Sequence, residues 1–178
     1  MFVVLTAAAG LAALTTMRRV QSFRVGGLEM DLSRRWMPAS LPRFLGDRVT
    51  DVAAFKDRGG QGAVMIVAAL ARDEPRPPAM VLGGAMAQMR LVPDLRAQSQ
   101  RQRLEVGALS GVRYLELSYR AYHGAPVPRT TVFAVVTDDE ERYWAIYIGT
   151  KGLKPRGALA ELVAMFDRIL QGARIVGE

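Results

Sequence analysis

The clearest hydrophobic pattern in the chain is that of an amphipathic helix near its C-terminus. Over residues 155–172, apolar side chains recur at spacings of three and four, which places them on one face of a helix. They are Leu159, Leu162, Val163, Phe166, Ile169 and Leu170. Pro155 lies near the expected start and Gly172 near the expected end, where these two residue types are favoured. We expect this helix to cover one face of a sheet.

Runs of β-branched and aromatic residues precede this helix and predict antiparallel strands. We expect strands over residues 104–106, 112–122, 130–137 and 142–149. Only a few residues separate the last three runs, and connections this short join antiparallel neighbours. In contrast, residues 96–103 are polar and basic without a hydrophobic face, so we interpret them as a solvated linker.

The N-terminal half begins with a hairpin pattern. Apolar and polar residues alternate over residues 22–32 on both sides of Gly26 and Gly27, and two glycines between alternating runs are typical of a two-residue hairpin turn. Residues 33–46 contain two prolines and no clean period, so we expect a loop there.

Two further strands and a helix are expected in the middle of the chain. Residues 63–71 form a nearly unbroken apolar run, which suits a strand buried on both faces, and residues 51–57 suit a neighbouring strand. Prolines are tolerated in the first turn of a helix, so we expect one over residues 77–91. The predicted fold class is α+β: an antiparallel sheet with one inserted helix and a C-terminal amphipathic helix.

The first seventeen residues carry no charged side chain, and Arg18 and Arg19 follow them directly. A helix of this length spans about 26 Å, slightly less than the hydrocarbon core of a bilayer at ~30 Å. We expect residues 1–19 to form an apolar helix that anchors the chain in a membrane, and residues 20–178 to form one domain. The larger apolar residues of the expected anchor are Phe2, Val3, Val4, Leu5, Leu11 and Leu14.

Two alternatives remain for this segment: a signal peptide or truncated anchor, and a helix packed on the domain itself. A secretory signal carries Lys or Arg before its apolar run, whereas only the terminal amine precedes this one. The positive-inside rule, applied to Arg18, Arg19 and Arg24, favours a cytoplasmic domain behind a single-pass helix. Positive residues upstream of Met1 would reverse that orientation.

The charge of the chain is strongly basic, with 24 Lys and Arg against 17 Asp and Glu, a net charge of +7. Cations beside a membrane anchor are attracted to anionic lipid by about 1 kcal/mol each. We therefore expect a set of basic residues to face lipid or the acidic surface of a partner: Arg18, Arg19, Arg24, Arg34 and Arg35. Nucleic acid is the alternative partner for a basic chain. The sequence contains no recognisable nucleic-acid-binding motif, so we do not expect nucleic acid as a partner.

Little in the sequence supports catalysis. The chain has no Cys, and His123 is its only histidine, so thiolate chemistry and imidazole or thiolate metal sites have no basis. We expect no enzyme activity, no cofactor and no bound metal. Lys151, Lys154 and Arg156 flank the start of the C-terminal helix, whose first amides could hold an anion, although an ordinary strand-to-helix loop is the alternative.

The order of the elements and three local features carry a resemblance to a known family. An apolar strand leads to residues 35–38 (RWMP), the penultimate strand is aromatic over residues 143–147 (YWAIY), and Arg-Ile follows the last helix at residues 174–175. Over residues 23–175 the chain resembles the PsbP-like family. The resemblance implies a non-enzymatic α+β domain, because the family includes extrinsic subunits of photosynthetic membrane complexes, small binding proteins and bacterial envelope lipoproteins. The chain lacks the lipidated Cys of the lipoproteins, so its N-terminal helix would provide the attachment.

Two functions are compatible with these features. The first is a non-catalytic, single-pass accessory subunit that stabilises or assembles a larger membrane complex, for example a photosynthetic or other electron-transfer complex. Its partners would be membrane lipids and the other subunits. The alternative is a solitary envelope domain that binds a small ligand or anionic lipid.

Overall fold

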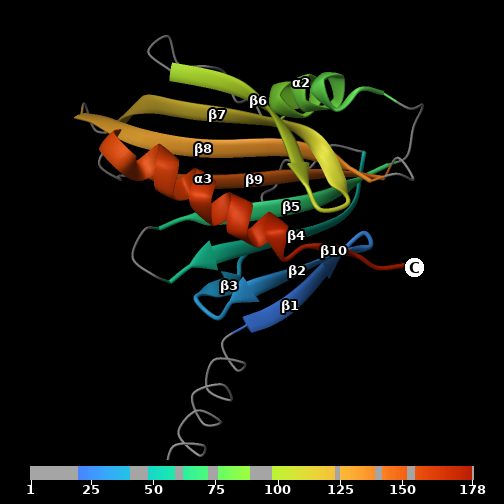
Figure 1. The fold of residues 1–178 in the computed structure, drawn as a ribbon. Coiled ribbons are helices and arrows are strands. Elements are labelled where there is room, and N and C mark those ends of the chain that lie inside the picture. The colour runs from blue at the N-terminus through green and yellow to red at the C-terminus, as the bar shows by residue number, and fades with distance from the viewer. Residues whose placement is uncertain are drawn as a thin grey trace, which may run out of the picture.

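The computed structural model describes residues 20–40, 48–58, 62–71, 76–88, 98–122, 125–138, 142–151 and 155–177. Figure 1 shows how strands and helices follow one another along these ranges. The strands of the first half are β1 (Val20–Val25), β2 (Leu28–Ser33), β3 (Trp36–Pro38), β4 (Val49–Asp57) and β5 (Val64–Leu70). Next come α2 (Pro78–Gln88), β6 (Gln98–Val106), β7 (Leu109–Tyr122), β8 (Ala125–Thr137), β9 (Tyr143–Lys151), α3 (Pro155–Gln171) and β10 (Arg174–Ile175).

The described strands form two antiparallel sheets. The large sheet has seven strands in the order β3-β4-β5-β9-β8-β7-β6, and the small one has three in the order β1-β2-β10. Strands β7, β8 and β9 are the predicted meander, and their antiparallel pairing is confirmed. The small sheet joins the two ends of the described chain, because β10 pairs with β2.

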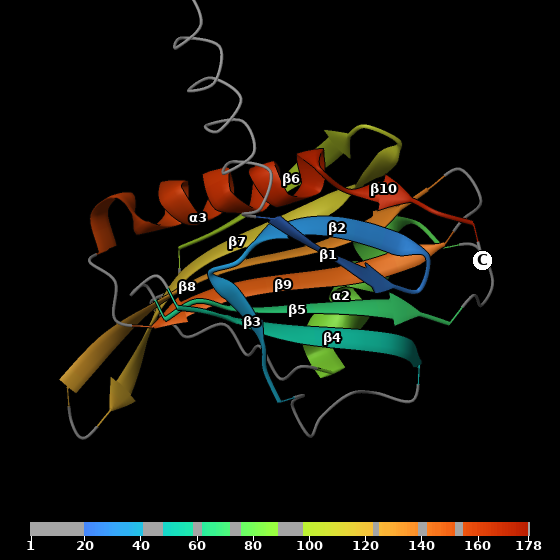
Figure 2. The ribbon, with the colours of Figure 1, turned by 90° about the horizontal axis from the view of Figure 1, so that it is seen from below.

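The large sheet lies between two layers. Figure 2 shows α3 and the small sheet on one of its sides and α2 on the other. On the α3 side, a row of apolar residues crosses the sheet from strand to strand: Leu115, Val132, Ile148, Met65 and Phe55. All of them are buried in the core that α3 and the small sheet cover. The hydrophobic face predicted for the C-terminal helix therefore packs on a sheet, as expected.

A second, smaller core lies on the α2 side. Leu82 of α2 is fully buried there and shares a cluster with Tyr114, Phe133 and Val135 of the sheet. No charged residue occurs in α2, although Met80 on its outer side is 63% exposed. The residues described as exposed on this helix, Ala79, Met80, Gly83 and Gly84, are therefore all uncharged and without polar side chains.

The β1–β2 hairpin turn is docked on the large sheet. Gly26 and Gly27 have φ values of 50° and 81°, a left-handed conformation that glycine adopts without steric cost. A Cβ on Gly26 would lie 2.2 Å from the Cβ of Ala69, so the turn approaches β5 closely. Trp144 of β9, which is 1% exposed, donates its indole N–H to the carbonyl of Val25 at 3.0 Å. The hairpin predicted over residues 22–32 is thus confirmed, and a buried tryptophan fixes its turn.

We expect Trp144→Phe to lower the free energy of unfolding by about 2 kcal/mol, because it leaves a small cavity and removes a buried hydrogen bond. The measurement is urea denaturation followed by far-UV circular dichroism. The exposed substitution Met80→Leu is the control and should change stability by less than about 0.5 kcal/mol. Equal stability of the Trp144→Phe variant and the wild type would contradict this role of the indole.

Two sequence interpretations are wrong in part. Residues 98–103, expected to be a linker, belong to β6, which pairs only with β7 and forms one edge of the large sheet. Exposed polar side chains, such as those of Arg101 and Arg103, suit an edge strand because they discourage pairing with other chains. Residues 36–38, expected to be part of a loop, form β3 and pair with β4.

The expected membrane anchor, residues 1–19, lies outside the described residues. Within the described ranges, neither helix combines the length and the apolar character that crossing a bilayer requires. The α+β fold of the domain is accordingly established without the N-terminal helix.

Candidate ligand-binding cleft

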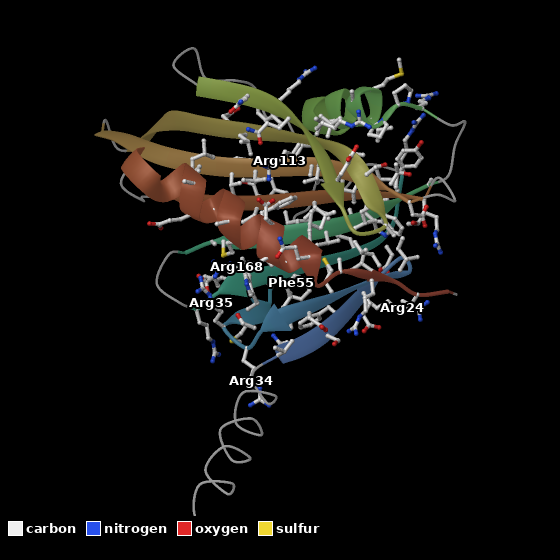
Figure 3. All side chains as sticks on the ribbon, viewed as in Figure 1. Arg24, Arg34, Arg35, Phe55, Arg113 and Arg168 are labelled. Atoms are coloured by element: carbon white, nitrogen blue, oxygen red, sulfur yellow. The ribbon has the colours of Figure 1, made fainter. Side chains whose placement is uncertain are left out.

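A cleft of about 340 Å³ lies between α3 and the turn that joins β2 to β3. Its strand side is lined by Asp31, Ser33, Arg35 and Trp36. Figure 3 shows Arg35 beside α3, on the same side of the helix as Arg168. The volume lies at the lower end of the range for small-molecule sites, about 300–1,000 Å³.

The helix side of the cleft is a short stripe on α3. Met165, Arg168 and Ile169 are spaced by three and four residues, so their side chains lie on one face of the helix. Met165 and Ile169 are buried at 8% and 7% exposure and give this wall an apolar base, whereas Arg168 is exposed. The cleft therefore combines apolar walls with charged groups at its opening.

Arg35 is held in place by a buried carboxylate. Its Nε and Nη2 each donate to one oxygen of Asp57 at 2.7 Å, and Nη2 also lies 3.8 Å from the sulfur of Met165. The side chain of Asp57 is fully buried, whereas that of Arg35 is 43% exposed. Pairing of β3 with β4 places Trp36 opposite Asp57 and so brings the two charged groups together. The remaining nitrogen, Nη1, makes none of these bonds and can donate to a ligand.

Arg168 is the second cation of the cleft. Its Nε donates to the Ala164 carbonyl at 3.1 Å, one turn earlier in α3. Neither Nη atom has a hydrogen bond or ion pair with another described residue. Arg168 therefore contributes a positive charge that no described carboxylate neutralises.

One acidic residue, Asp31, also lines the cleft, and Glu29 lies two residues before it in β2. Arg174 of β10 donates from Nη2 to Glu29 at 3.0 Å and to both oxygens of Asp31 at 3.2 Å. The hydroxyl of Ser22 also donates to Asp31, at 2.6 Å. Two carboxylates of β2 thus share one guanidinium.

The sequence grouped five basic residues near the expected anchor, and the structure brings two of the three described ones together. Arg34 and Arg35 follow Ser33, which pairs with Val20 at the start of β1. Arg24 lies toward the other end of β1 and donates to the Gly177 carbonyl at 2.5 Å. Figure 3 shows this separation between Arg24 and Arg34.

Other predicted site residues cannot be placed. Arg18, Arg19 and Lys154, together with the six anchor residues, fall outside the described ranges. Lys151 is the last residue of β9 and Arg156 lies in the first turn of α3, but their side chains are not described. The anion-binding loop therefore stays a prediction.

Sequence reasoning missed further basic residues near the β2–β3 turn. Lys56 and Arg58 are exposed beside the β2–β3 turn, where the amide of Arg58 donates to the Arg35 carbonyl at 2.8 Å. The pairing of β3 with β4 brings them there, and no local pattern indicated it. Arg168 lies on the polar side of the predicted C-terminal helix, away from its apolar stripe, so the helical pattern did not single it out either. No group of three His, Asp or Glu residues able to hold a metal ion occurs in the described part of the chain.

Comparisons with known proteins identify the fold but no family. No family model and no curated protein matches the chain. Its fold is similar to that of LpqN from Mycobacterium tuberculosis, a protein described as involved in cell envelope biogenesis. The TM-score is 0.50 at 13% identity, over 94% of this chain and 97% of LpqN. PA94 of Pseudomonas aeruginosa, a protein of unknown function, gives a TM-score of 0.45 at 14% identity, over 90% and 98% of the two chains.

Proposed function

We propose that this chain is a non-catalytic, membrane-anchored domain of the cell envelope that binds a small anionic ligand or an anionic lipid head group. One observation carries the proposal: Arg35 and Arg168 line the same cleft, and each keeps nitrogen atoms free of other described partners. Guanidinium groups are suited to carboxylate and phosphate, and Asp57 fixes one of them before a ligand arrives.

The position of the cleft supports attachment next to a membrane. Residues 1–19 join the domain at Val20, which is opposite Ser33 of the cleft wall. Two exposed cations lie at this end of the domain: Arg34 in the β2–β3 turn, and Arg58, whose amide donates to the Arg35 carbonyl. Each attracts anionic lipid by about 1 kcal/mol when it lies near a membrane surface. In this arrangement the cleft opens close to the lipid head groups.

The fold is compatible with an envelope role. LpqN, which has a similar fold, is described as involved in cell envelope biogenesis. The PsbP-like family, which the sequence resembles, also includes envelope proteins and is mostly non-enzymatic. We place the domain in that family as part of the proposal.

Binding of a short-chain anionic lipid tests the proposal. Dihexanoyl phosphatidylglycerol would be titrated by calorimetry into the full chain in an uncharged detergent. We expect binding, and we expect Arg168→Gln to weaken it at least tenfold, because hydrogen bonds to charged groups contribute about 1.5–3 kcal/mol. Arg103→Gln is the matched control, since Arg103 is 82% exposed on β6 at the far edge of the sheet. Equal affinity of the Arg168→Gln variant and the wild type would contradict the cleft as the site.

An accessory subunit of a membrane complex is the second candidate. The outer surface of α2 supports it, because that helix has no charged residue and Met80 is 63% exposed. Solubilisation of native membranes in mild detergent would distinguish the two functions. A particle many times the 19.5 kDa of the chain favours the subunit, and a particle of this mass plus detergent favours the solitary domain.

A further inference from the structure

The cleft has a cationic end and an anionic end, and this polarity restricts what it can bind. Its lining includes Arg35 and Arg168 but also the carboxylate of Asp31. A simple anion would gain from the two arginines and would be repelled by Asp31. A ligand with both charges could use the whole length of the cleft.

The two carboxylates of the anionic end share a single ion-pair partner among the described residues. Glu29 and Asp31 have only Arg174 as an ion-pair partner among the described residues. Arg24 stands opposite Glu29 on β1, but its guanidinium bonds to the Gly177 carbonyl instead. The side chain of Asp31 is 34% exposed, so a ligand can reach it.

The end of α3 adds to this negative potential. A Cβ placed on Gly172, just beyond the helix, would lie 3.8 Å from the Cβ of Asp31 and 3.7 Å from the Ile169 carbonyl oxygen. The last carbonyl groups of a helix carry partial negative charge and attract cations. Asp31 and the C-terminus of α3 therefore favour a positive group at the same place.

The distance between the two ends can be estimated along α3. Arg35 contacts Met165, whereas Asp31 lies beside Gly172. From Met165 to Gly172 the chain advances seven residues, which corresponds to about 10 Å along the helix axis. A charge-assisted hydrogen bond takes about 3 Å at each end, which leaves about 4–5 Å between the two charges of a ligand. Phosphate and ammonium groups joined by an ethyl linker are about 4–5 Å apart, given bond lengths near 1.5 Å.

We propose that the cleft binds a zwitterionic phosphoethanolamine group, with its phosphate on Arg35 and Arg168 and its ammonium on Asp31. This inference rests on the part of the proposed function that places an anionic group on Arg35 and Arg168, and it adds an ammonium group to that ligand. The group can come from a lipid head group or from a free soluble molecule, because the recognised atoms are the same in both.

The inference is tested by calorimetric titration of four probes into the full chain, which is kept in an uncharged detergent. The probes are free phosphoethanolamine, inorganic phosphate, dihexanoyl phosphatidylethanolamine and dihexanoyl phosphatidylglycerol. Free phosphoethanolamine is compared with inorganic phosphate, and the phosphatidylethanolamine with the phosphatidylglycerol. In at least one of these two pairs, we expect the phosphoethanolamine probe to bind at least tenfold more tightly than the other. Binding of the free and lipid forms with equal affinity indicates a soluble ligand, and binding of the lipid form alone indicates a head group.

Substitution of Asp31 tests the position of the ammonium. We expect Asp31→Asn to remove the preference for phosphoethanolamine while the affinity for inorganic phosphate stays the same or rises. Glu105→Gln is the matched control, since Glu105 is 65% exposed on β6, and it should leave both affinities unchanged. If Asp31→Asn does not fold, the preference of the wild-type chain among the four probes still decides the matter.

The four titrations distinguish failure of the zwitterionic ligand from failure of the anionic function proposed above. If the anionic probes bind as tightly as their phosphoethanolamine counterparts, the zwitterionic ligand is wrong and the anionic function stands. If none of the four probes binds, both proposals are wrong.

Discussion

Replacing Leu11 and Leu14 together by Arg is expected to release the chain from membranes. Each change exchanges a side chain that favours the bilayer for one that costs about 2.5–3.5 kcal/mol at the bilayer centre. Leu14 lies nearer the end of the segment than Leu11, so the pair costs at most about 6–8 kcal/mol. The expected anchor has no spare length to compensate, since seventeen helical residues span about 26 Å. The measurement is the share of the chain that sediments with membranes after a high-salt wash.

The salt wash removes binding that depends on the basic surface alone, because salt screens exposed charges. The control is the double variant Leu11→Ala and Leu14→Ala, which keeps the segment uncharged and should stay largely in the pellet. An arginine variant that sediments like the wild type would show that residues 1–19 are not the anchor.

Arg35→Gln is expected to lower the free energy of unfolding by about 3 kcal/mol. Breaking a buried ion pair costs about 3–5 kcal/mol, because the remaining charge stays buried without its partner. Here the carboxylate that remains, that of Asp57, is fully buried. We take the lower end of the range because Arg35 is 43% exposed and Asp57 has a further interaction.

Arg34→Gln is the matched control for that experiment. Arg34 is the adjacent residue in the same turn and carries the same charge, but it is exposed and has no bond to another described residue. Its substitution should change stability by less than about 0.5 kcal/mol. Chemical denaturation of both variants gives the comparison. Equal stabilities would mean that the pair with Asp57 contributes little to the fold.

The elements that the sequence predicted best are those with a strong local pattern. The helix expected over residues 155–172 is observed as Pro155–Gln171, because its six apolar residues fix both its period and its buried face. The strands of the meander were identified for a similar reason. Their alternation and short connections determine the pairing of neighbours, and the register of β8 with β9 follows.

The features that the sequence did not predict depend on distant residues. Residues 98–103, the first part of β6, contain no apolar side chain, and only their pairing with β7 identifies them as strand. The small sheet requires residues 174–175 to reach residues 28–29. No property of either short segment indicates that partner.

The cleft was missed for the same reason. The sequence singled out Arg35 as a basic residue near the anchor, but its two contacts lie 22 and 130 positions further along the chain. Charge counting identifies cations without showing which of them a buried carboxylate holds. The distinction between Arg34 and Arg35 is therefore a product of the fold.

The pairing of β10 with β2 has a consequence for the time at which the domain is completed. Glu29 and its partner Arg174 are 145 positions apart. At a synthesis rate of about 5–20 residues per second, roughly 7–30 s pass between them. During that interval β2 lacks one neighbour, and Asp31 has not yet met the guanidinium that it shares with Glu29. The acidic end of the cleft is therefore assembled only after residue 174 has been synthesised, long after β2 itself.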